Sequence, residues 1–357
     1  MKIGIILHPY GEKHPAGLHR TIFEWTSALL RNDRTNDYFI FLKEKPRFSL
    51  PLPGKNWRVE VLGGGFFWLD RLCLKEPADV YIFNTPVLPL FFRPKRSIVI
   101  ALDFGYLYFS PKGWQELIRN FIVRLYHGFS LRRAGQIVAI SEASKNDVMR
   151  FFHIPESKIK VIYCGFKKIC ETAEEPVEAP DKFFLFAGVI KERKNVFNIV
   201  RAFNDFHRKE GRYKLVIGGK GEGAYYEAIL KFIAKNNLDK EIIFLGHLND
   251  RQLSFLYKKA EALIFPSIVE GFGFPVLEAM HCGLPVITSN VSSLAELGAN
   301  NAALLVNPQS VGDIAEAMSR IVKDNDFRQN LIRNGFLQVQ RFSWDKAAEE
   351  LLDLITV

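Results

Sequence analysis

The chain alternates short apolar segments with longer amphipathic ones, and the same alternation begins again at Phe183. Apolar runs such as Ile3–Leu7 and Val80–Phe83 have the length of buried strands, whereas Trp114–Arg133 repeats its apolar residues at helical spacing. Strands that alternate with helices are typical of a parallel sheet covered on both faces. The sequence therefore predicts an α/β protein with two doubly wound, Rossmann-like domains.

A stretch of different composition separates the two alternating regions. Residues 167–182 include four glutamates and two prolines, as is typical of an inter-domain linker. We expect a first domain at 1–168, a second at 169–341 and a terminal segment at 342–357. Ligands of doubly wound sheets bind beyond the carboxyl ends of the strands, so we expect the pocket in the cleft between the domains.

The segment 262–290 carries the pattern that says most about chemistry. It predicts a buried strand, a loop with Glu270, Gly271, Phe272 and Gly273, a short helix that contains Glu278, and a second buried strand. The amides of Gly271, Phe272 and Gly273 converge at a helix N-terminus, which attracts phosphate. A carboxylate accepts paired hydrogen bonds from the adjacent hydroxyls of a sugar. We therefore interpret this segment as a nucleotide-sugar pocket; the alternative is an acidic loop beside a helix cap.

Three other loops follow predicted strands of the second domain. In 187–195, Arg193 and Lys194 precede a helix whose predicted N-cap is Asn195, and they are placed to neutralise a diphosphate. The glycine-rich turn 218–223, with Gly219, is predicted to touch the nucleotide. The segment 246–250, with Leu248, is predicted to meet the base through its main chain. The alternative for 187–195 is a solvated basic loop, and the alternative for 218–223 is a turn that simply reverses the chain.

Loops of the first domain are harder to interpret. Gly17, a candidate residue for binding the donor, lies in the long loop 8–20 that follows the first strand, and Asp103 ends the strand Ile98–Leu102. Asp103 is a candidate catalytic residue, with a turn cap as the alternative. The histidines of the first loop do not have the spacing of a metal site, and we expect no metal. The helix Trp114–Arg133 is expected to pack on its sheet, with a membrane-surface helix as the alternative. Residues 67–69 and 106–109 are predicted to form exposed aromatic contacts.

The charge distribution and the cysteine content indicate which partners and which cellular compartment to expect. Residues 1–170 hold 26 Lys and Arg against 14 Asp and Glu, a balance of +12 within a total of +9. Such an asymmetry indicates that the first half meets an anionic surface. No motif supports nucleic-acid binding, and we do not expect the protein to bind nucleic acid. Cys73, Cys164, Cys170 and Cys282 show neither metal spacing nor a disulfide framework, and no apolar run reaches the length of a membrane span. We expect a cytoplasmic protein, with possible peripheral contact at the inner membrane face.

Residues 269–280, with Glu270 and Glu278 eight positions apart, resemble the Glu-x7-Glu signature of retaining GT-B glycosyltransferases, the large family 4 or group 1. The resemblance covers nearly the whole chain, because 139–145, 161–165, 192–195, 304–308 and 342–348 are also similar to family segments. It implies a GT-B fold whose last helix returns to the first domain.

The resemblance also implies roles for matched residues. Glu270 holds hydroxyls of the donor sugar, and Glu278 holds those of the ribose. Lys194, assisted by Arg193, and the amides of Gly271–Gly273 bind the diphosphate. The donor is an NDP-sugar, with GDP-mannose favoured over a UDP-hexose, and the acceptor is a glycan or lipid-linked precursor. The transfer retains the anomeric configuration and needs neither cofactor nor metal.

Three positions depart from the family pattern. Leu102 precedes Asp103 where a histidine is common, Val189 follows Gly188 where an arginine is common, and Ala16 stands where the first loop often has a second glycine. Two alternatives to a glycosyltransferase stay open. One is a nucleotide-sugar epimerase or hydrolase of the same fold, and the other is a non-catalytic glycan-binding protein.

Overall fold

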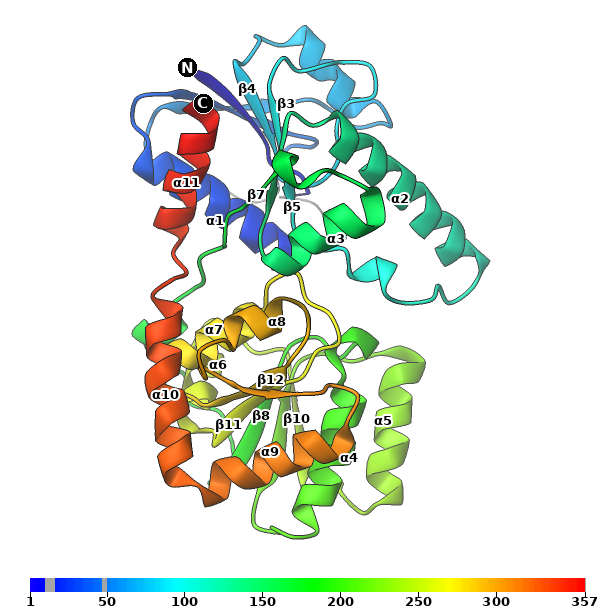
Figure 1. The fold of residues 1–357 in the computed structure, drawn as a ribbon, viewed down its shortest axis with the longest axis vertical. Coiled ribbons are helices and arrows are strands. Elements are labelled where there is room, and N and C mark those ends of the chain that lie inside the picture. Colours follow the sequence, from blue (N-terminus) through cyan, green and yellow to red (C-terminus); the bar gives the residue numbers. More distant parts are fainter. Residues whose placement is uncertain (10–16, 47–49, 357) are drawn as a thin grey trace. The chain divides into compact units, whose positions relative to one another are not determined.

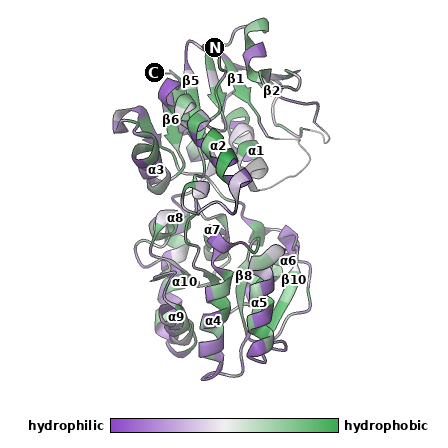
Figure 2. Ribbon diagram, turned by 90° about the vertical axis from the view of Figure 1, so that its right-hand side faces the viewer, coloured by the Kyte–Doolittle hydropathy of each residue, from purple (hydrophilic) through white to green (hydrophobic). Residues whose placement is uncertain are grey.

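Two parallel sheets organise the described residues, which are 1–9, 17–46 and 50–356 in this computed structural model. The chain divides into unit 1, Met1–Gly165 with Phe342–Val357, and unit 2, Phe166–Arg341. The strands of both units are mostly apolar, as the green ribbons in Figure 2 show. The prediction of an α/β protein with two Rossmann-like sheets is confirmed.

Within the described residues, the sheet of unit 1 has seven strands in the order β3-β2-β1-β4-β5-β6-β7. Helices α1 and α11 cover one face and α2 and α3 the other (Figure 1). The strands are β1 (Lys2–Ile6), β2 (Asp37–Leu42), β3 (Trp57–Val61), β4 (Val80–Phe83), β5 (Ser97–Ala101), β6 (Gln136–Ala139) and β7 (Ile159–Val161). The helices are α1 (Gly17–Asn32), η1 (Trp68–Leu74), η2 (Gly105–Leu107), α2 (Trp114–Arg133), α3 (Glu142–Phe152), η3 (Glu156–Lys158) and α11 (Trp344–Thr356).

The C-terminal helix α11 is an integral part of unit 1, because it packs against α1. The rings of Trp25 in α1 and Trp344 in α11 meet edge to face at 5.8 Å. Gly165 allows the close approach of this helix, since a Cβ there would lie 2.2 Å from the Trp344 nitrogen. The guanidinium of Arg96 also donates to the Ile355 carbonyl at 2.7 Å.

The described sheet of unit 2 has six strands in the order β10-β9-β8-β11-β12-β13. Helix α9 packs on α4, and α10 packs on α7. The strands are β8 (Phe183–Ala187), β9 (Lys214–Gly218), β10 (Ile242–Gly246), β11 (Ala262–Phe265), β12 (Val286–Ser289) and β13 (Leu304–Val306). The helices are η4 (Ile169–Glu171), η5 (Glu192–Lys194), α4 (Val196–His207), α5 (Gly223–Lys235), α6 (Asp250–Lys259), α7 (Phe274–His281), α8 (Ser292–Leu297), α9 (Val311–Lys323) and α10 (Asn325–Val339).

Two expectations about exposed apolar residues of unit 1 are wrong in part. The apolar side of α2 does not pack on the sheet along its first three turns, because Leu117, Phe121 and Leu125 are all more than half exposed. In the segment 67–69, Phe67 is exposed, but Trp68 and Leu69 belong to the core. Among the helices described, none combines the length and the apolar content that a membrane span requires.

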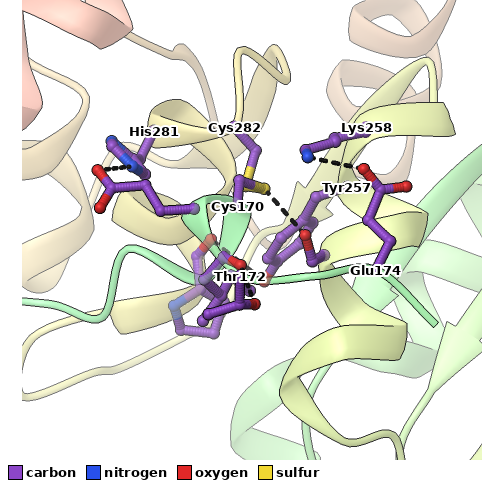
Figure 3. Close-up of a disulfide and its surroundings, with 11 residues drawn as sticks. Cys170, Thr172, Glu174, Tyr257, Lys258, His281 and Cys282 are labelled. Carbon is purple, nitrogen blue, oxygen red and sulfur yellow. Dashed lines mark hydrogen bonds and ion pairs between the residues drawn. A yellow bond between two sulfur atoms is a disulfide. The ribbon is translucent and has the colours of Figure 1, made fainter.

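The sequence did not indicate the disulfide that joins Cys170 and Cys282, so the expectation of unpaired cysteines is wrong for this pair. Figure 3 shows that it links η4, near the start of unit 2, to the residue that follows α7. An ion pair between Glu171 and His281 lies beside it, with Oε1 and Nε2 at 3.4 Å. The hydroxyl of Ser254 in α6 donates to the Cys170 sulfur at 3.6 Å. The chain that enters unit 2 is thus fastened to α6 and α7.

Replacing Cys170 with Ser is expected to lower the stability of the protein. The disulfide closes a segment with a sequence separation of 112, and such a cross-link restricts the unfolded chain by up to about 4 kcal/mol. We expect a lower midpoint of urea denaturation for Cys170→Ser, and an equal loss when the wild type is treated with dithiothreitol.

Cys73 supplies the control, because it is a free and exposed cysteine. Cys73→Ser should keep the wild-type midpoint without reductant. A midpoint for Cys170→Ser equal to that of the oxidised wild type would contradict a stabilising cross-link.

Candidate functional site

The order of the strands in unit 2 defines where a ligand can bind. β8 is followed along the chain by β9 on one side, whereas β11 pairs with it on the other side. From β8 the chain first adds β9 and β10 on one side and then crosses over to add β11 on the other side, so the direction in which strands are added reverses at β8. Doubly wound sheets bind ligands at such a switch point, outside the carboxyl ends of the strands. The loops that leave β8 and β11 are the ones that contain Arg193, Lys194 and Glu270.

The structure brings these three predicted residues into direct contact. Lys194 Nζ lies 2.6 Å from Glu270 Oε1, and Arg193 Nη1 lies 2.9 Å from Glu270 Oε2. Arg193 Nη1 also donates to the Val269 carbonyl at 3.2 Å, and Lys194 Nζ lies 4.7 Å from the centre of the Phe265 ring. One carboxylate thus holds two cations, each on its own oxygen.

This group is largely withdrawn from water. The side chain of Glu270 is 7% exposed and that of Lys194 13%, whereas Arg193 retains 31%. Burial acts to raise the pKa of Glu270, but the adjacent charges of Lys194 and Arg193 outweigh it and the pKa is lowered. The carboxylate is therefore ionised at neutral pH. With one negative and two positive charges, the group has an excess charge of +1.

The loop after Glu270 is held in place by two serines at the start of α8. Ser293 Oγ donates to the carbonyls of Glu270 at 3.0 Å and Phe272 at 2.7 Å, and the Glu270 amide donates to Ser292 Oγ at 3.3 Å. Gly273 occupies the N-cap position of α7 with φ +111°. A side chain there would be strained, and its Cβ would lie 2.6 Å from Leu294 Cδ2.

Glu278 lies within α7 and is buried, 7% exposed. Pro275 stands in the first turn, where a missing amide hydrogen costs no helical bond. The carbonyl of Glu278 accepts from the amide of Cys282, one turn later. The disulfide at Cys282 therefore anchors the end of the same helix that contains Glu278.

Asn195 does not act as the predicted side-chain cap of α4. Its backbone has φ +61°, and its amide nitrogen Nδ2 instead donates to the carbonyls of Pro266 at 3.0 Å and Pro308 at 2.6 Å. Asn195 thus ties the loop after β8 to the loop after β11 and to the segment after β13. Sequence reasoning identified neither this tie nor the serines of α8, because their partners are distant in the chain.

The two glycine-containing turns lie at neighbouring strand ends of the same sheet. At Gly219, a Cβ would lie 1.9 Å from the Gly188 carbonyl oxygen, so packing of main chain against main chain requires glycine there. The Leu248 side chain lies against Gly218, where a Cβ would be 2.4 Å from Leu248 Cδ1. Gly218 and Gly219 therefore have a structural reason for their identity, apart from any contact with a nucleotide.

Two predicted residues belong to unit 1. Gly17 is the first residue of α1, and residues 10–16, with Ala16, lie outside the described residues. Asp103 is exposed after β5, and its Oδ1 accepts from the Gly105 amide at 2.6 Å. This bond is the turn-capping contact named as the alternative for Asp103, and its catalytic role stays a prediction. Leu102 is buried, whereas Val189 in unit 2 is 52% exposed.

A pair of Rossmann-like sheets, one of which has a cationic group at its switch point, defines a protein of the GT-B class. Residues 171–338 match the family model described as glycosyl transferases group 1, and residues 20–167 match that of glycosyltransferase family 4. The two matches extend over both units. The chain belongs to this glycosyltransferase family.

Similar proteins of known or assigned activity are also glycosyltransferases. O-antigen chain mannosyltransferase B of Escherichia coli is 26% identical over 76% of this chain and 73% of its own length. The serotype-specific mannosyltransferase WbdA of Escherichia coli is 32% identical over 63% of this chain, but this match spans only 29% of WbdA. An N-acetylgalactosaminyltransferase of Campylobacter jejuni, named for a diphospho-undecaprenol substrate, is 25% identical over 98% of both chains.

Solved structures show the same fold at low sequence identity. The sucrose-phosphate synthase of Thermosynechococcus elongatus has a TM-score of 0.78 at 19% identity, covering 99% of this chain and 98% of its own. Anabaena HepE, in complex with UDP and glucose, has a TM-score of 0.75 at 17% identity and covers 100% and 99%.

The pH dependence of stability tests the charge state of Glu270. Its pKa in the folded protein lies below its ordinary value of 4.5, so the ionised carboxylate stabilises the fold above that value. This contribution is lost as the pH falls through the lowered, folded-state pKa. Glu270→Gln leaves Lys194 and Arg193 without their carboxylate, and we expect a loss of about 3 kcal/mol at neutral pH.

The loss should be measured by urea denaturation of wild type and variant across the acidic range, and it should shrink as the pH falls below 4.5. Glu227→Gln, at an exposed position of α5, is the control and should change little. A difference between wild type and Glu270→Gln that does not vary with pH would contradict the ionised, ion-paired carboxylate.

Proposed function

We propose that this protein transfers a hexose from a nucleotide-sugar to a glycan or lipid-linked acceptor, with retention of the anomeric configuration. The observation that carries the proposal is the buried contact of Glu270 with Lys194 and Arg193 at the switch point of unit 2. It places an acceptor of hydroxyl hydrogen bonds beside two donors suited to a diphosphate.

The residues of unit 2 take distinct roles in this proposal. Lys194 and Arg193 bind the diphosphate, together with the amides of Gly271, Phe272 and Gly273 at the start of α7. Glu270 holds hydroxyls of the donor sugar, and Glu278 holds those of the ribose. The main chain at Gly219 and Leu248 meets the nucleoside. From unit 1, Asp103 is the candidate catalytic residue, and Gly17 is a candidate residue for binding the donor.

The chemistry follows from where charge develops. When the bond between the sugar and the phosphate breaks, the departing diphosphate gains negative charge. The excess positive charge of the group around Glu270 stabilises that charge without a metal ion. In a retaining transfer on one face of the sugar, a diphosphate oxygen accepts the proton of the acceptor hydroxyl.

Relatives and fold neighbours support different donors. The names of two relatives contain mannosyltransferase, which favours GDP-mannose, whereas the HepE structure holds UDP and glucose, which favours a UDP-hexose. The Campylobacter relative is named for a substrate attached to diphospho-undecaprenol, which supports a lipid-linked acceptor. A lipid-linked acceptor and the charge balance of +12 in residues 1–170 together favour peripheral contact of unit 1 with the inner face of an anionic membrane.

A thermal-shift panel of UDP, GDP, ADP and CMP with their sugars, without added metal, tests the donor site. A ligand at about 100 times its dissociation constant stabilises the folded state by ~2.7 kcal/mol, so one nucleotide should raise the melting temperature clearly. Lys194→Met should abolish most of this shift, because it removes a charged contact to the diphosphate.

Arg201→Met serves as the matched control, since Arg201 is an exposed cation on α4. It should keep the full shift. Absence of a shift with every nucleotide would contradict a donor site. Release of free sugar with no transfer to any lipid-linked acceptor would instead favour a hydrolase.

A further inference from the structure

Helix α2 has its apolar side turned outward along its N-terminal part. Trp114, Leu117, Ile118, Phe121, Ile122 and Leu125 follow one another at helical spacing and are 49–68% exposed. The opposite side, with Glu116, Asn120 and His127, is less exposed. A helix that covers a sheet normally buries its apolar stripe. We call the six exposed residues the α2 stripe.

The C-terminal part of α2 is firmly attached to the rest of unit 1. Arg133 Nη1 donates to the Leu90 carbonyl at 2.6 Å, the Tyr126 hydroxyl donates to the Leu88 carbonyl at 2.7 Å, and Arg132 Nη2 donates to the Phe152 carbonyl at 3.2 Å. From this anchor the N-terminal end extends along the outside of the unit (Figure 1). The α2 stripe is thus presented on a fixed support.

The charges around the stripe are predominantly positive. Residues 112–133 include Lys112, Arg119, Arg124, Arg132 and Arg133, with Glu116 as the acidic residue. Glu116 is engaged locally, because it accepts from the Lys112 amide at 2.7 Å and from Arg119 at 3.0 Å. An apolar stripe with cations on its flanks is the pattern of a helix that lies in the interface of an anionic bilayer.

A second copy of the chain is a poorer occupant. In a two-fold dimer the α2 stripe would meet its own copy, so the predominantly positive flanks of the two helices would be brought together across an apolar contact. An anionic lipid surface offers the complementary charge to these flanks and an apolar interior to the stripe.

We propose that α2 docks unit 1 on an anionic lipid bilayer, with the α2 stripe inserted below the headgroups and the flanking arginines at the level of the lipid phosphates. This deepens the membrane contact proposed above and rests on that part of the proposed function. It would bring the acceptor side of the enzyme to the surface that holds a lipid-linked acceptor.

The test is flotation of the full chain with vesicles of phosphatidylcholine alone or mixed with phosphatidylglycerol. The wild type should bind the mixed vesicles, and added salt should weaken binding. The triple variant Ile118→Gln, Phe121→Gln, Leu125→Gln should bind at least ~10-fold more weakly, because three side chains lose their burial in lipid. Its positions are exposed, so the fold should persist, and its shift with nucleotide should equal that of the wild type.

Phe66 and Phe91 supply a matched control, because they are exposed aromatic residues of unit 1 outside α2, 81% and 76% exposed. Phe66→Gln, Phe91→Gln should bind mixed vesicles as the wild type does. Vesicles should also shift the tryptophan emission to the blue, and Trp114→Phe should lose most of that shift, since Trp114 begins the stripe.

Equal vesicle binding by the α2 variant and the wild type would overturn the role of α2. No binding by the wild type would overturn the membrane contact as well, and a preserved nucleotide shift would then leave the donor site standing. Self-association that the α2 variant abolishes, without vesicle binding, would identify a second copy as the occupant and also overturn the proposal.

Discussion

The candidate site depends on the ionised carboxylate of Glu270 remaining inside the protein. A buried carboxylate is stable only when cations or hydrogen-bond donors compensate its lost hydration. Lys194 and Arg193 provide that compensation from a loop 76 and 77 residues away in the chain. The same contact fixes the two cations in one place and leaves an excess charge of +1. Stability and the capacity to bind an anion therefore come from one interaction.

The topology of unit 2 explains how the contact forms. β8 and β11 are neighbours in the sheet although β9 and β10 separate them in the chain, so their loops meet at one edge. Asn195, whose side chain donates to the Pro266 and Pro308 carbonyls, ties these loops together. Ser292 and Ser293 hold the loop that follows Glu270. These side chains bond to main-chain atoms of the loops, so they position the loops without occupying the charged groups of Glu270, Lys194 and Arg193.

Sequence reasoning predicted what is local. The predicted helix Trp114–Arg133 has the same bounds in the structure, because apolar periodicity and turn residues act over a few positions. It also identified Arg193, Lys194 and Glu270 as candidates, because a basic loop and an acidic loop each follow a strand. It did not predict that the three form one ion-paired group, which depends on strand order.

The errors share a cause in tertiary packing. Periodicity shows that α2 has an apolar side but does not show which surface that side contacts. In the structure, the N-terminal part of this side is exposed. Cys170 and Cys282 are 112 residues apart, and this spacing does not indicate a disulfide. The two cysteines meet because η4 packs beside the end of α7. Asn195 has the sequence position of a helix cap, yet distant carbonyls compete successfully for its amide.

A structure of the protein with a bound nucleoside diphosphate would test the central claim most directly. The account predicts diphosphate oxygens within ~3 Å of Lys194 Nζ and of the amides at the start of α7, with Glu270 beside them. A diphosphate bound elsewhere, with the contact between Glu270 and the two cations unchanged and no ligand beside it, would contradict it.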